Sequence, residues 1–457
     1  MVMIDILYYF DLVAVICIKF LLPLLLIYVL FLFLQKKVFN VSKKKKLLQE
    51  ASKHSAKGVI FGKSKSKVIY SPSSDEGHIA VFGGSGVGKT SAILIPTLRS
   101  WSGTSFTIDI SGDICKNVHM PNKIVYEPEN SNTLPYDIFH AIDQIDNEFK
   151  QNEMLEQLSF LLMPDSEKFS DASAFYNTEG RKILTASLIA FYHQGKDFID
   201  ICKIVFSNSW KDLFNQIDNT NCLEAIQYIN SFEGASEQNN AGCKQACDAS
   251  IKLFATNYTI QNTIRRPKED ERYFAPNVLE NNNVFIVIQD SKLKLFSPLL
   301  HIITAQSLEF FSERSNDNST TILFCLDEFA SLGKMEITDA LRKLRKKHVR
   351  IMMLTQSMAD IDLIYGKSER MAMMNNFSFK VILEASDTET QDYFAKLIGY
   401  QPTKKRSVST NSHTTTKTLS EDKEWIIEPS DLARLGDNLI LLYRDGYKQL
   451  QKNFYFK

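Results

Sequence analysis

The chain has 457 residues, a length with room for two or three domains. Hydrophobic residues make up 44% and charged residues 23% of them, which is a globular composition. Its 53 basic and 53 acidic residues balance, which excludes a bulk electrostatic attraction to nucleic acid and leaves only local patches for such contacts. The seven cysteines are odd in number and scattered, which excludes a disulfide framework and fits a reducing compartment.

The first predicted element is a membrane-spanning helix. Residues 12–34 are almost wholly apolar, broken by Lys19 and Pro23. At about 1.5 Å per residue, such a run can cross the ~30 Å hydrocarbon core of a bilayer. Aspartates precede the run and lysines follow it, which argues against a signal peptide and places the bulk of the chain in the cytoplasm. We therefore expect a single-pass protein of the cell membrane, with an N-terminal transmembrane helix.

Residues 1–50 are assigned to this membrane anchor and a basic stalk. The positive character continues beyond them, with lysines at positions 53, 57, 63, 65 and 67. Next to a membrane anchor such lysines are typical of a solvated stalk that faces lipid headgroups, and we prefer this interpretation to a DNA-binding patch.

A phosphate-binding loop follows a buried strand predicted at residues 78–82 and precedes an apolar helix at 90–98. The loop spells G-x-x-x-x-G-K-T with Gly83, Gly84, Ser85, Gly86, Val87, Gly88, Lys89 and Thr90. Its backbone N–H groups can converge on one anion, Lys89 can reach the β- and γ-phosphates, and the Thr90 hydroxyl can hold Mg²⁺. A glycine-rich turn that binds nothing is the alternative, and the preceding strand argues against it. The sequence predicts a site for ATP and Mg²⁺.

Strands and helices alternate in much of the remaining chain. Strands are predicted at residues 59–61, 68–70, 105–109, 124–126, 284–288, 322–326, 349–354, 377–383 and 439–442. A helix over 298–311 is expected to begin after Ser297 as its N-cap. Apolar strands that alternate with helices indicate a parallel sheet covered on both faces. We expect an α/β fold, a RecA-like P-loop NTPase with a mainly parallel sheet.

An inserted all-α domain interrupts this sheet. Helical periodicity dominates from about residue 143 to about residue 272, and strand signals nearly vanish there. We assign 145–274 to the inserted domain, and 51–144 together with 275–457 to the nucleotide-binding domain. Residues 403–421 are rich in Ser, Thr and Lys without an apolar core, which predicts a loop or a mobile hairpin.

An acidic pair at a strand end predicts hydrolysis. The apolar strand 322–326 ends in Asp327 and Glu328, at the carboxyl edge where open α/β sheets bind ligands. We assign Asp327 to the metal shell and Glu328 to the general base that activates water. An acidic pair arises often by chance, but here it follows a buried strand in a chain with a complete P-loop.

The sequence alone leaves open the roles of two downstream residues, Arg345 and Gln356. Arg345 lies in the basic segment 341–348, and by default such a run is a solvated helix face. The next strand ends beside Gln356, where a polar side chain can sense the γ-phosphate. Structural and catalytic roles are both open for Arg345 and Gln356.

Together the motifs resemble the TraG/TraD/VirD family of type IV coupling proteins, across nearly the whole chain. The resemblance rests on the anchor, the P-loop followed by Pro96, and the strand ending in Asp109. It rests also on the helical insertion, the stretch Leu-Asp-Glu-Phe-Ala-Ser-Leu-Gly-Lys at 326–334, and Gln356 followed by Tyr365 and Gly366. The chain departs from the family in having Ser-Gly-Asp at 111–113 for a usual Lys-Gly-Glu, and one predicted span where many members have two.

The resemblance implies a membrane-anchored hexameric ATPase of conjugation, with nucleotide held between subunits. An arginine eleven residues before the glutamine resembles an arginine finger that acts across the subunit boundary, which favours a catalytic role for Arg345 and Gln356. The implied partners are single-stranded DNA with its relaxase, or protein effectors, and the components of a type IV secretion channel. The implied role of the helical domain is to meet the relaxase and accessory proteins.

Two other functions remain open. One is a docking receptor that recruits protein cargo to the membrane, with nucleotide in a structural role. The other is a DNA translocase of the FtsK/HerA type, which the helical insertion between the two nucleotide motifs disfavours. An ABC transporter ATPase is less consistent still, because the chain contains no Leu-Ser-Gly-Gly-Gln stretch.

Overall fold

The computed structural model describes residues 47–165, 170–317, 320–411 and 414–456. The predicted transmembrane helix lies outside these residues. Within them, no helix combines the length and the apolar character needed to cross a bilayer.

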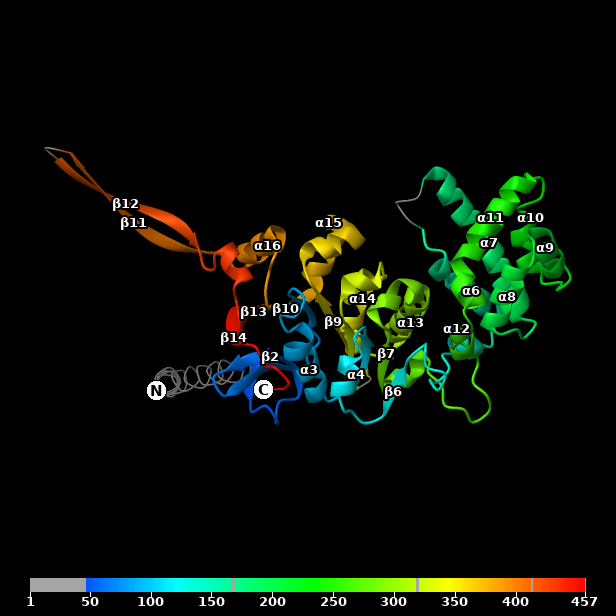
Figure 1. Cartoon of the computed structure of the whole chain (residues 1–457), viewed down its shortest axis with the longest axis horizontal. Coiled ribbons are helices and arrows are strands. Elements are labelled where there is room, and N and C mark those ends of the chain that lie inside the picture. Colours follow the sequence, from blue (N-terminus) through cyan, green and yellow to red (C-terminus); the bar gives the residue numbers. More distant parts are fainter. Residues whose placement is uncertain (1–46, 166–169, 318–319, 412–413, 457) are drawn as a thin grey trace, which may run out of the picture. The chain divides into compact units, whose positions relative to one another are not determined.

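A mixed sheet of twelve strands forms the centre of the predicted nucleotide-binding part, in the order β1-β3-β2-β14-β13-β10-β4-β9-β8-β5-β7-β6 (Figure 1). The strands are β1 (Gln49–Ala51), β2 (Gly58–Ser64), β3 (Lys67–Pro72), β4 (His78–Phe82), β5 (Thr104–Asp109), β6 (Lys123–Tyr126), β7 (Asn283–Val287), β8 (Ile322–Leu326), β9 (Val349–Thr355), β10 (Phe377–Ile382), β13 (Asn438–Tyr443) and β14 (Gly446–Gln451). The predicted α/β class and every strand predicted in this part are confirmed.

The half of the sheet from β10 to β6 is parallel throughout. Every residue of β4, β5, β8 and β9 is buried, because helices and loops cover both faces of these central strands. Aromatic packing links neighbouring strands, with the Phe106 and Phe324 rings stacked 4.4 Å apart. The parallel register brings the carboxyl ends of these strands to one edge, where the site residues follow.

The other half of the sheet is antiparallel and was not predicted. Each neighbouring pair in this half is antiparallel: β10 with β13, β13 with β14, β14 with β2, and β2 with β3. The pairing of β14 with β2 joins segments near opposite ends of the chain, at Gln451 and Lys63. The sheet is therefore parallel only in the half that carries the P-loop.

The helices of this part are α3 (Ile95–Ser100), α4 (Asp113–Asn117), α13 (Leu293–Glu313), α14 (Ile337–Lys343), α15 (Met358–Asn376) and α16 (Thr388–Ile398). Short helical turns accompany them, namely η2 (Lys89–Leu94), η3 (Pro276–Glu280), η4 (Asp290–Lys292), η5 (Phe329–Leu332), η6 (Leu344–Lys347) and η7 (Pro429–Ala433). Helix α3 packs against β2, and α15 packs against β9 and β10.

The predicted start of α13 is wrong. The helix does not begin after Ser297 but at Leu293, and Pro298 lies inside it. Proline removes one backbone hydrogen bond there. The first turn, however, buries Leu293 and Phe296, so apolar burial outweighs that loss.

The segment predicted as a loop or hairpin is a hairpin, formed by β11 (Tyr400–Asn411) and β12 (Thr414–Trp425). The two strands pair only with each other, as a separate two-stranded sheet. At its base the rings of Tyr400 and Trp425 stack 4.1 Å apart.

The described residues between β6 and β7 form the helices that the sequence predicted there (Figure 1). These are α5 (His140–Asp143), α6 (Glu148–Leu162), α7 (Asp171–Tyr192), α8 (Phe198–Ser207), α9 (Trp210–Asp218), α10 (Leu223–Asn230), α11 (Glu237–Thr256) and α12 (Tyr258–Thr263). Side chains of Ser170, Asp197, Ser209 and Ser236 accept backbone N–H bonds at helix starts. The domain boundaries at 145 and 274 remain predictions.

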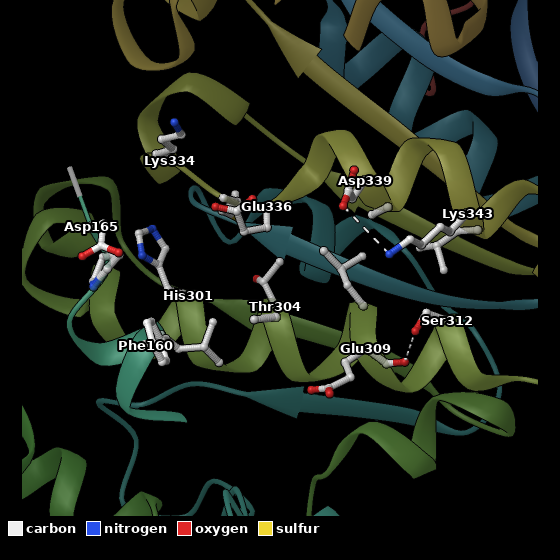
Figure 2. A pocket seen from close by; sticks show the side chains of 17 residues that line it. Phe160, Asp165, His301, Thr304, Glu309, Ser312, Lys334, Glu336, Asp339 and Lys343 are labelled. Carbon is white, nitrogen blue, oxygen red and sulfur yellow. Dashed lines mark hydrogen bonds and ion pairs between the residues drawn. The ribbon is translucent and has the colours of Figure 1, made fainter. Parts of the chain in front are cut away.

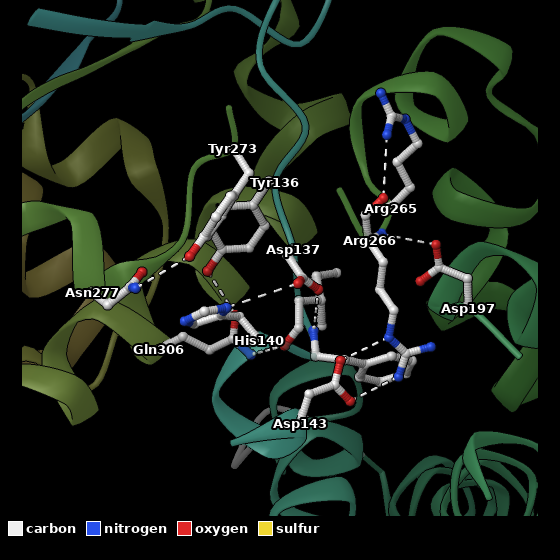
Figure 3. Close-up of polar contacts among 12 residues, drawn as sticks. Tyr136, Asp137, His140, Asp143, Asp197, Arg265, Arg266, Tyr273, Asn277 and Gln306 are labelled. Carbon is white, nitrogen blue, oxygen red and sulfur yellow. Dashed lines mark hydrogen bonds and ion pairs between the residues drawn. The ribbon is translucent and has the colours of Figure 1, made fainter. Parts of the chain in front are cut away.

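The two connections to this helical segment are bonded to each other (Figure 3). Tyr136 forms backbone bridges with Ile264 and Phe274, so the entering and leaving chains lie side by side. Arg266 then donates from Nε and Nη2 to the two carboxylate oxygens of Asp143, at 2.7 and 2.8 Å. A bidentate guanidinium–carboxylate pair has a defined geometry, so it fixes the end of α5 against the returning chain.

Candidate functional site

The P-loop has the predicted geometry. It connects β4 to η2, and Gly86 and Gly88 adopt positive φ of 77° and 107°, a region in which side chains are strained. A Cβ atom on Gly88 would also come within 3.0 Å of the Phe454 ring. Glycine is required at these positions because the loop must turn its N–H groups toward one point.

Lys89 is buried at the centre of the site, with 5% of its surface exposed. Its Nζ donates to the carbonyl oxygens of Gly83 and Gly84, at 2.8 and 3.2 Å. The same nitrogen lies 2.9 Å from Glu328 Oε1. The predicted phosphate-binding lysine and the predicted general base are therefore in direct contact.

Thr90 and Asp327 meet as the sequence predicts for a metal site. The Thr90 hydroxyl donates to Asp327 Oδ1 at 3.3 Å. Burial raises the pKa of Asp327 to about 7, and the nearby carboxylates of Glu328 and Asp109 add to this shift. A hydroxyl and a carboxylate oxygen side by side fit Mg²⁺, which is held by few protein oxygens together with water and phosphate. A cation here would also relieve the charge crowding among the three carboxylates.

Glu328 has a strained backbone, with φ of 47° and ψ of 55°. A residue other than glycine in the left-handed region is uncommon and is often found at functional sites. Gln356, which follows β9, donates from Nε2 to Glu328 Oε2 at 3.3 Å. Lys89 and Gln356 thus bind one oxygen each of the Glu328 carboxylate, so the structure brings together all three residues.

Asp109, at the end of β5, was recognised only as a strand-ending acid. Its Oδ1 accepts bonds from the backbone N–H groups of Ser111 and Gly112, at 3.2 and 2.8 Å, and its Oδ2 accepts from Cys115 N at 2.7 Å. The buried carboxylate therefore shapes the loop where this chain has Ser-Gly-Asp in place of the family's Lys-Gly-Glu.

Arg345 is not part of this cluster. It lies exposed on η6, and no hydrogen bond or ion pair connects it with the P-loop or the acidic pair among the described residues. Its own chain therefore gives it no catalytic contact, and the role across a subunit boundary stays a prediction.

Buried His78 positions the segment that carries Arg345, and the sequence analysis missed this. His78 Nδ1 accepts from the backbone N–H of Ile351 at 2.9 Å, so Nε2 carries the proton and donates to the carbonyl of Leu341 at 3.0 Å. Burial lowers the pKa of His78 to about 4. A neutral histidine at the start of the P-loop strand thus holds α14 in place, a few residues before Arg345.

Tyr365 supports the loop that carries Glu328. Its hydroxyl accepts from Met335 N at 2.9 Å and donates to Gly333 O at 3.3 Å. Its ring stacks on the ring of Phe329, with the two ring centres 5.3 Å apart. Phe329 directly follows Glu328 in the chain. The sequence analysis noted Tyr365 without a role, and the structure shows that it braces the turn after β8.

A cavity of about 610 Å³ opens beside the same turn (Figure 2). Lys334 and Glu336 face His301 and Thr304 of α13 across it, and Phe160 borders it from the end of α6. None of the sequence-predicted site residues lines this cavity. The cavity therefore lies where the helical insertion meets α13 and the turn after β8, and it is distinct from the P-loop site.

The sheet, the glycine loop and the acidic strand end define a P-loop NTPase fold. The chain belongs to the family described as "Type IV secretory system Conjugative DNA transfer", whose model matches residues 34–457. This finding confirms the family suggested by the sequence motifs.

Relatives and solved structures agree with this assignment. The chain is similar to the protein VirD4 of Rhizobium radiobacter (22% identical, 77% of this chain and 53% of the relative). It is also similar to VirD4 of Agrobacterium fabrum (21% identical, 86% of this chain and 61% of the relative). A third relative is a probable conjugal transfer protein TraG of Sinorhizobium fredii (22% identical, 82% of this chain and 61% of the relative). The chain thus spans between 53% and 61% of the length of these relatives.

The fold is shared with a solved coupling protein. The structure of the "bacterial conjugative coupling protein TrwBdeltaN70" matches with a TM-score of 0.66 at 17% identity, over 83% of this chain and 85% of that one. The plasmid coupling protein TrwB in complex with ADP and Mg²⁺ matches with a TM-score of 0.65 over the same shares of both chains.

Proposed function

We propose that this protein is an ATPase that couples a complex of DNA and relaxase to a type IV secretion channel in conjugative transfer. The observation that carries the proposal is the contact of Lys89, Gln356 and Glu328 beside the Thr90–Asp327 pair, in a chain of the conjugative DNA transfer family. Two relatives are named probable conjugal transfer protein TraG and type IV secretion system-coupling protein VirD4, and these names support a role in conjugative transfer.

The geometry suggests how the reaction proceeds. The backbone N–H groups of the P-loop bind the phosphates, and Lys89 exchanges Glu328 for a phosphate oxygen. Thr90 and Asp327 would hold Mg²⁺, which would neutralise charge that develops on the phosphates. Glu328, released from Lys89, accepts a proton from the attacking water, and Gln356 orients that water from the neighbouring strand. As the water oxygen bonds to the γ-phosphorus, the bond from that phosphorus to the bridging oxygen breaks, and ADP leaves with the bridging oxygen.

The site is completed by a second subunit in this proposal. Arg345 is exposed and lies outside the cluster of its own chain, which is what an arginine that acts on a neighbour's nucleotide requires. We infer a homo-oligomer, a hexamer by family resemblance. We propose that the single membrane span predicted from the sequence anchors this ring at the cytoplasmic face of the cell membrane.

A docking receptor is the second candidate function, because the helical insertion exposes large apolar side chains. Phe149 is 80% exposed and Leu223 76% exposed, at the starts of α6 and α10. Exposed apolar groups on a soluble domain are typical of protein interaction sites. Such a surface can recruit protein cargo without hydrolysis.

A delivery assay with Glu328→Gln separates the two functions. The variant keeps the size of the side chain and one accepting oxygen, and it removes the base. DNA transfer from donor to recipient cells should be abolished if hydrolysis drives delivery, while recruitment of cargo to the membrane persists. Transfer at the wild-type frequency would instead support a docking receptor and contradict the ATPase proposal.

A further inference from the structure

A smaller cavity of about 290 Å³ lies where the described chain begins and shares no lining residue with the nucleotide site. The loop after β1, the strands β2 and β3, helix α3 and the C-terminal segment surround it. Its lining residues are Lys53, His54, Ala56, Ile60, Val68, Pro96, Arg99, Ser100, Asn453 and Tyr455.

The cavity has an apolar floor and a cationic rim. Ala56, Ile60 and Val68 are 4% exposed or less and form a small apolar cluster of their own. Lys53, His54 and Arg99 are exposed above them, and no carboxylate is among the described lining residues. A cavity with this division of surface suits a ligand that carries both an anion and an apolar part.

The cations of the rim are crowded and partly held in place. Partial burial lowers the pKa of Lys53, and the nearby Lys63 and Arg99 lower it further. Arg99 donates from Nε and Nη2 to the carbonyl of Asn117, at 3.0 and 2.7 Å, and its guanidinium lies 4.9 Å from the centre of the Tyr455 ring. An anion bound between these groups would relieve their mutual repulsion.

Asn453 supplies a second indication of a ligand. Its side chain is 1% exposed, yet Oδ1 has no hydrogen-bond partner among the described residues. Oδ1 is also closed to water, so the amide must turn toward the cavity before a hydroxyl or N–H group of a ligand can donate to it.

We propose that this cavity binds the phosphoglycerol headgroup of an anionic membrane lipid. The phosphate lies between Lys53 and Arg99, and a headgroup hydroxyl donates to Asn453 Oδ1. The apolar floor takes the glycerol backbone where the acyl chains begin. This site goes beyond the proposed ATPase activity and uses none of the nucleotide-binding residues.

Its place in the chain favours a lipid over a free phosphate. Eighteen residues separate Lys53 from Leu34, the end of the predicted membrane span. At up to about 3.3–3.6 Å per residue, that linker allows the cavity to reach the bilayer surface. An apolar floor would gain nothing from inorganic phosphate, whereas it would bury the apolar part of a lipid.

Calorimetric titration of the full chain in a nonionic detergent tests the proposal. Dihexanoyl phosphatidylglycerol should bind about tenfold or more tightly than zwitterionic dihexanoyl phosphatidylcholine, because only the first retains a net negative charge beside the rim. The double variant Lys53→Gln, Arg99→Gln should lose most of this preference. Lys57→Gln is the matched control, since Lys57 is an exposed lysine of the same loop that does not line the cavity. Equal affinity for both lipids, or an unchanged double variant, would overturn the site.

Further titrations in the same experiment identify the source of the bound anion. Asn453→Ala should weaken phosphatidylglycerol but not phosphatidic acid, which lacks the headgroup hydroxyls, and equal weakening of both would contradict the role of Asn453. Inorganic phosphate that displaces the lipid at similar concentration would overturn the lipid assignment. A single-stranded oligonucleotide whose binding depends on Lys53 and Arg99 would show a nucleic-acid contact instead. Thermal unfolding of each variant confirms that the fold persists.

Discussion

Lys89 Nζ lies 2.9 Å from Glu328 Oε1, so the predicted phosphate-binding lysine and the predicted base form an ion pair within one subunit. A bound phosphate must compete with Glu328 for the same ammonium group. Gln356 contacts the other oxygen of that carboxylate, at 3.3 Å. In the proposed reaction, nucleotide binding and release of the base are therefore linked through the side chain of Lys89.

Glu328→Gln should separate binding from hydrolysis. Without the base, ATP hydrolysis should fall by about 10²- to 10⁴-fold, the usual contribution of general acid–base catalysis. ATP affinity should stay equal or rise, because the neutral amide competes less strongly for Lys89. Steady-state hydrolysis and a fluorescent-nucleotide titration measure the two effects.

Lys89→Ala is the control for this separation. It removes a charge-assisted phosphate contact and should lower nucleotide affinity by about 1.5–3 kcal/mol. A Glu328→Gln variant that lost affinity as Lys89→Ala does would show that the carboxylate supports binding, contrary to the proposed exchange.

Tyr365→Phe should destabilise the turn after β8. The ring can keep its stack on Phe329, but the buried N–H of Met335 loses its acceptor, at a cost of about 1–3 kcal/mol. We expect a lower free energy of unfolding and a lower kcat, because this turn follows Glu328 directly. Urea unfolding and hydrolysis assays measure both. Tyr258→Phe, at a tyrosine that is 77% exposed, should change neither. Wild-type kcat in Tyr365→Phe would rule out support of Glu328 by this hydroxyl.

Asp137 should make stability depend on pH. Burial raises the pKa of Asp137 from 3.8 to about 7; Asp143 and Asp197 add to the shift, whereas Arg266 opposes it. His140 and Tyr136 are further titratable neighbours, and His140 Nδ1 lies 4.0 Å from a carboxylate oxygen of Asp137. Between pH 3.8 and about pH 7, the ordinary and the raised pKa of Asp137, the folded chain holds a proton on this carboxylate that the unfolded chain releases. The Asp137 contribution to the free energy of unfolding therefore falls as pH rises from about 4 to about 7, by at most about 1.4 kcal/mol per pH unit.

Asp137→Asn removes this titration while the side chain keeps an acceptor for the backbone N–H of Phe139. The drop in melting temperature from pH 5 to pH 8 should be smaller in the variant than in the wild-type protein. An identical pH dependence in both proteins would show that Asp137 does not titrate in this range.

Arg345→Ala tests the shared site. Arginine fingers contribute about 10³- to 10⁵-fold to kcat, so this variant alone should be nearly inactive, as should Glu328→Gln alone. Mixing the two variants should restore hydrolysis, because some interfaces then pair an intact Arg345 with an intact Glu328. Arg342→Ala, at an exposed arginine of the same segment, should leave activity unchanged. Absence of recovery at every mixing ratio would contradict a catalytic role across the interface.

The P-loop and the acidic pair could be predicted because their chemistry is local. Gly86, Gly88 and Lys89 occupy fixed positions along a few residues, and Asp327 and Glu328 end an unmistakably apolar strand. Their meeting in space follows from parallel strands whose carboxyl ends share one edge. The contact between Lys89 and Glu328 itself required the structure, because no spacing along the chain encodes it.

Other features could not be predicted, for physical reasons. The antiparallel half of the sheet depends on β14 pairing with β2, between segments nearly four hundred residues apart at Gln451 and Lys63. His78 and Tyr365 each make two hydrogen bonds to backbone groups, and such bonds leave no periodic pattern in the sequence. Pro298 predicts a first-turn position and so a later start for α13, whereas burial of Leu293 and Phe296 extends the helix to the turn before it.

The most direct test of the proposed function is ATP hydrolysis by the purified protein, with and without single-stranded DNA. If hydrolysis drives DNA transfer, single-stranded DNA should raise the rate in the wild-type protein, the stimulation should weaken as salt rises, and Glu328→Gln should show neither effect. Equal rates with and without DNA at low salt, in an oligomer that binds nucleotide, would contradict the proposal that this ATPase is coupled to DNA transfer.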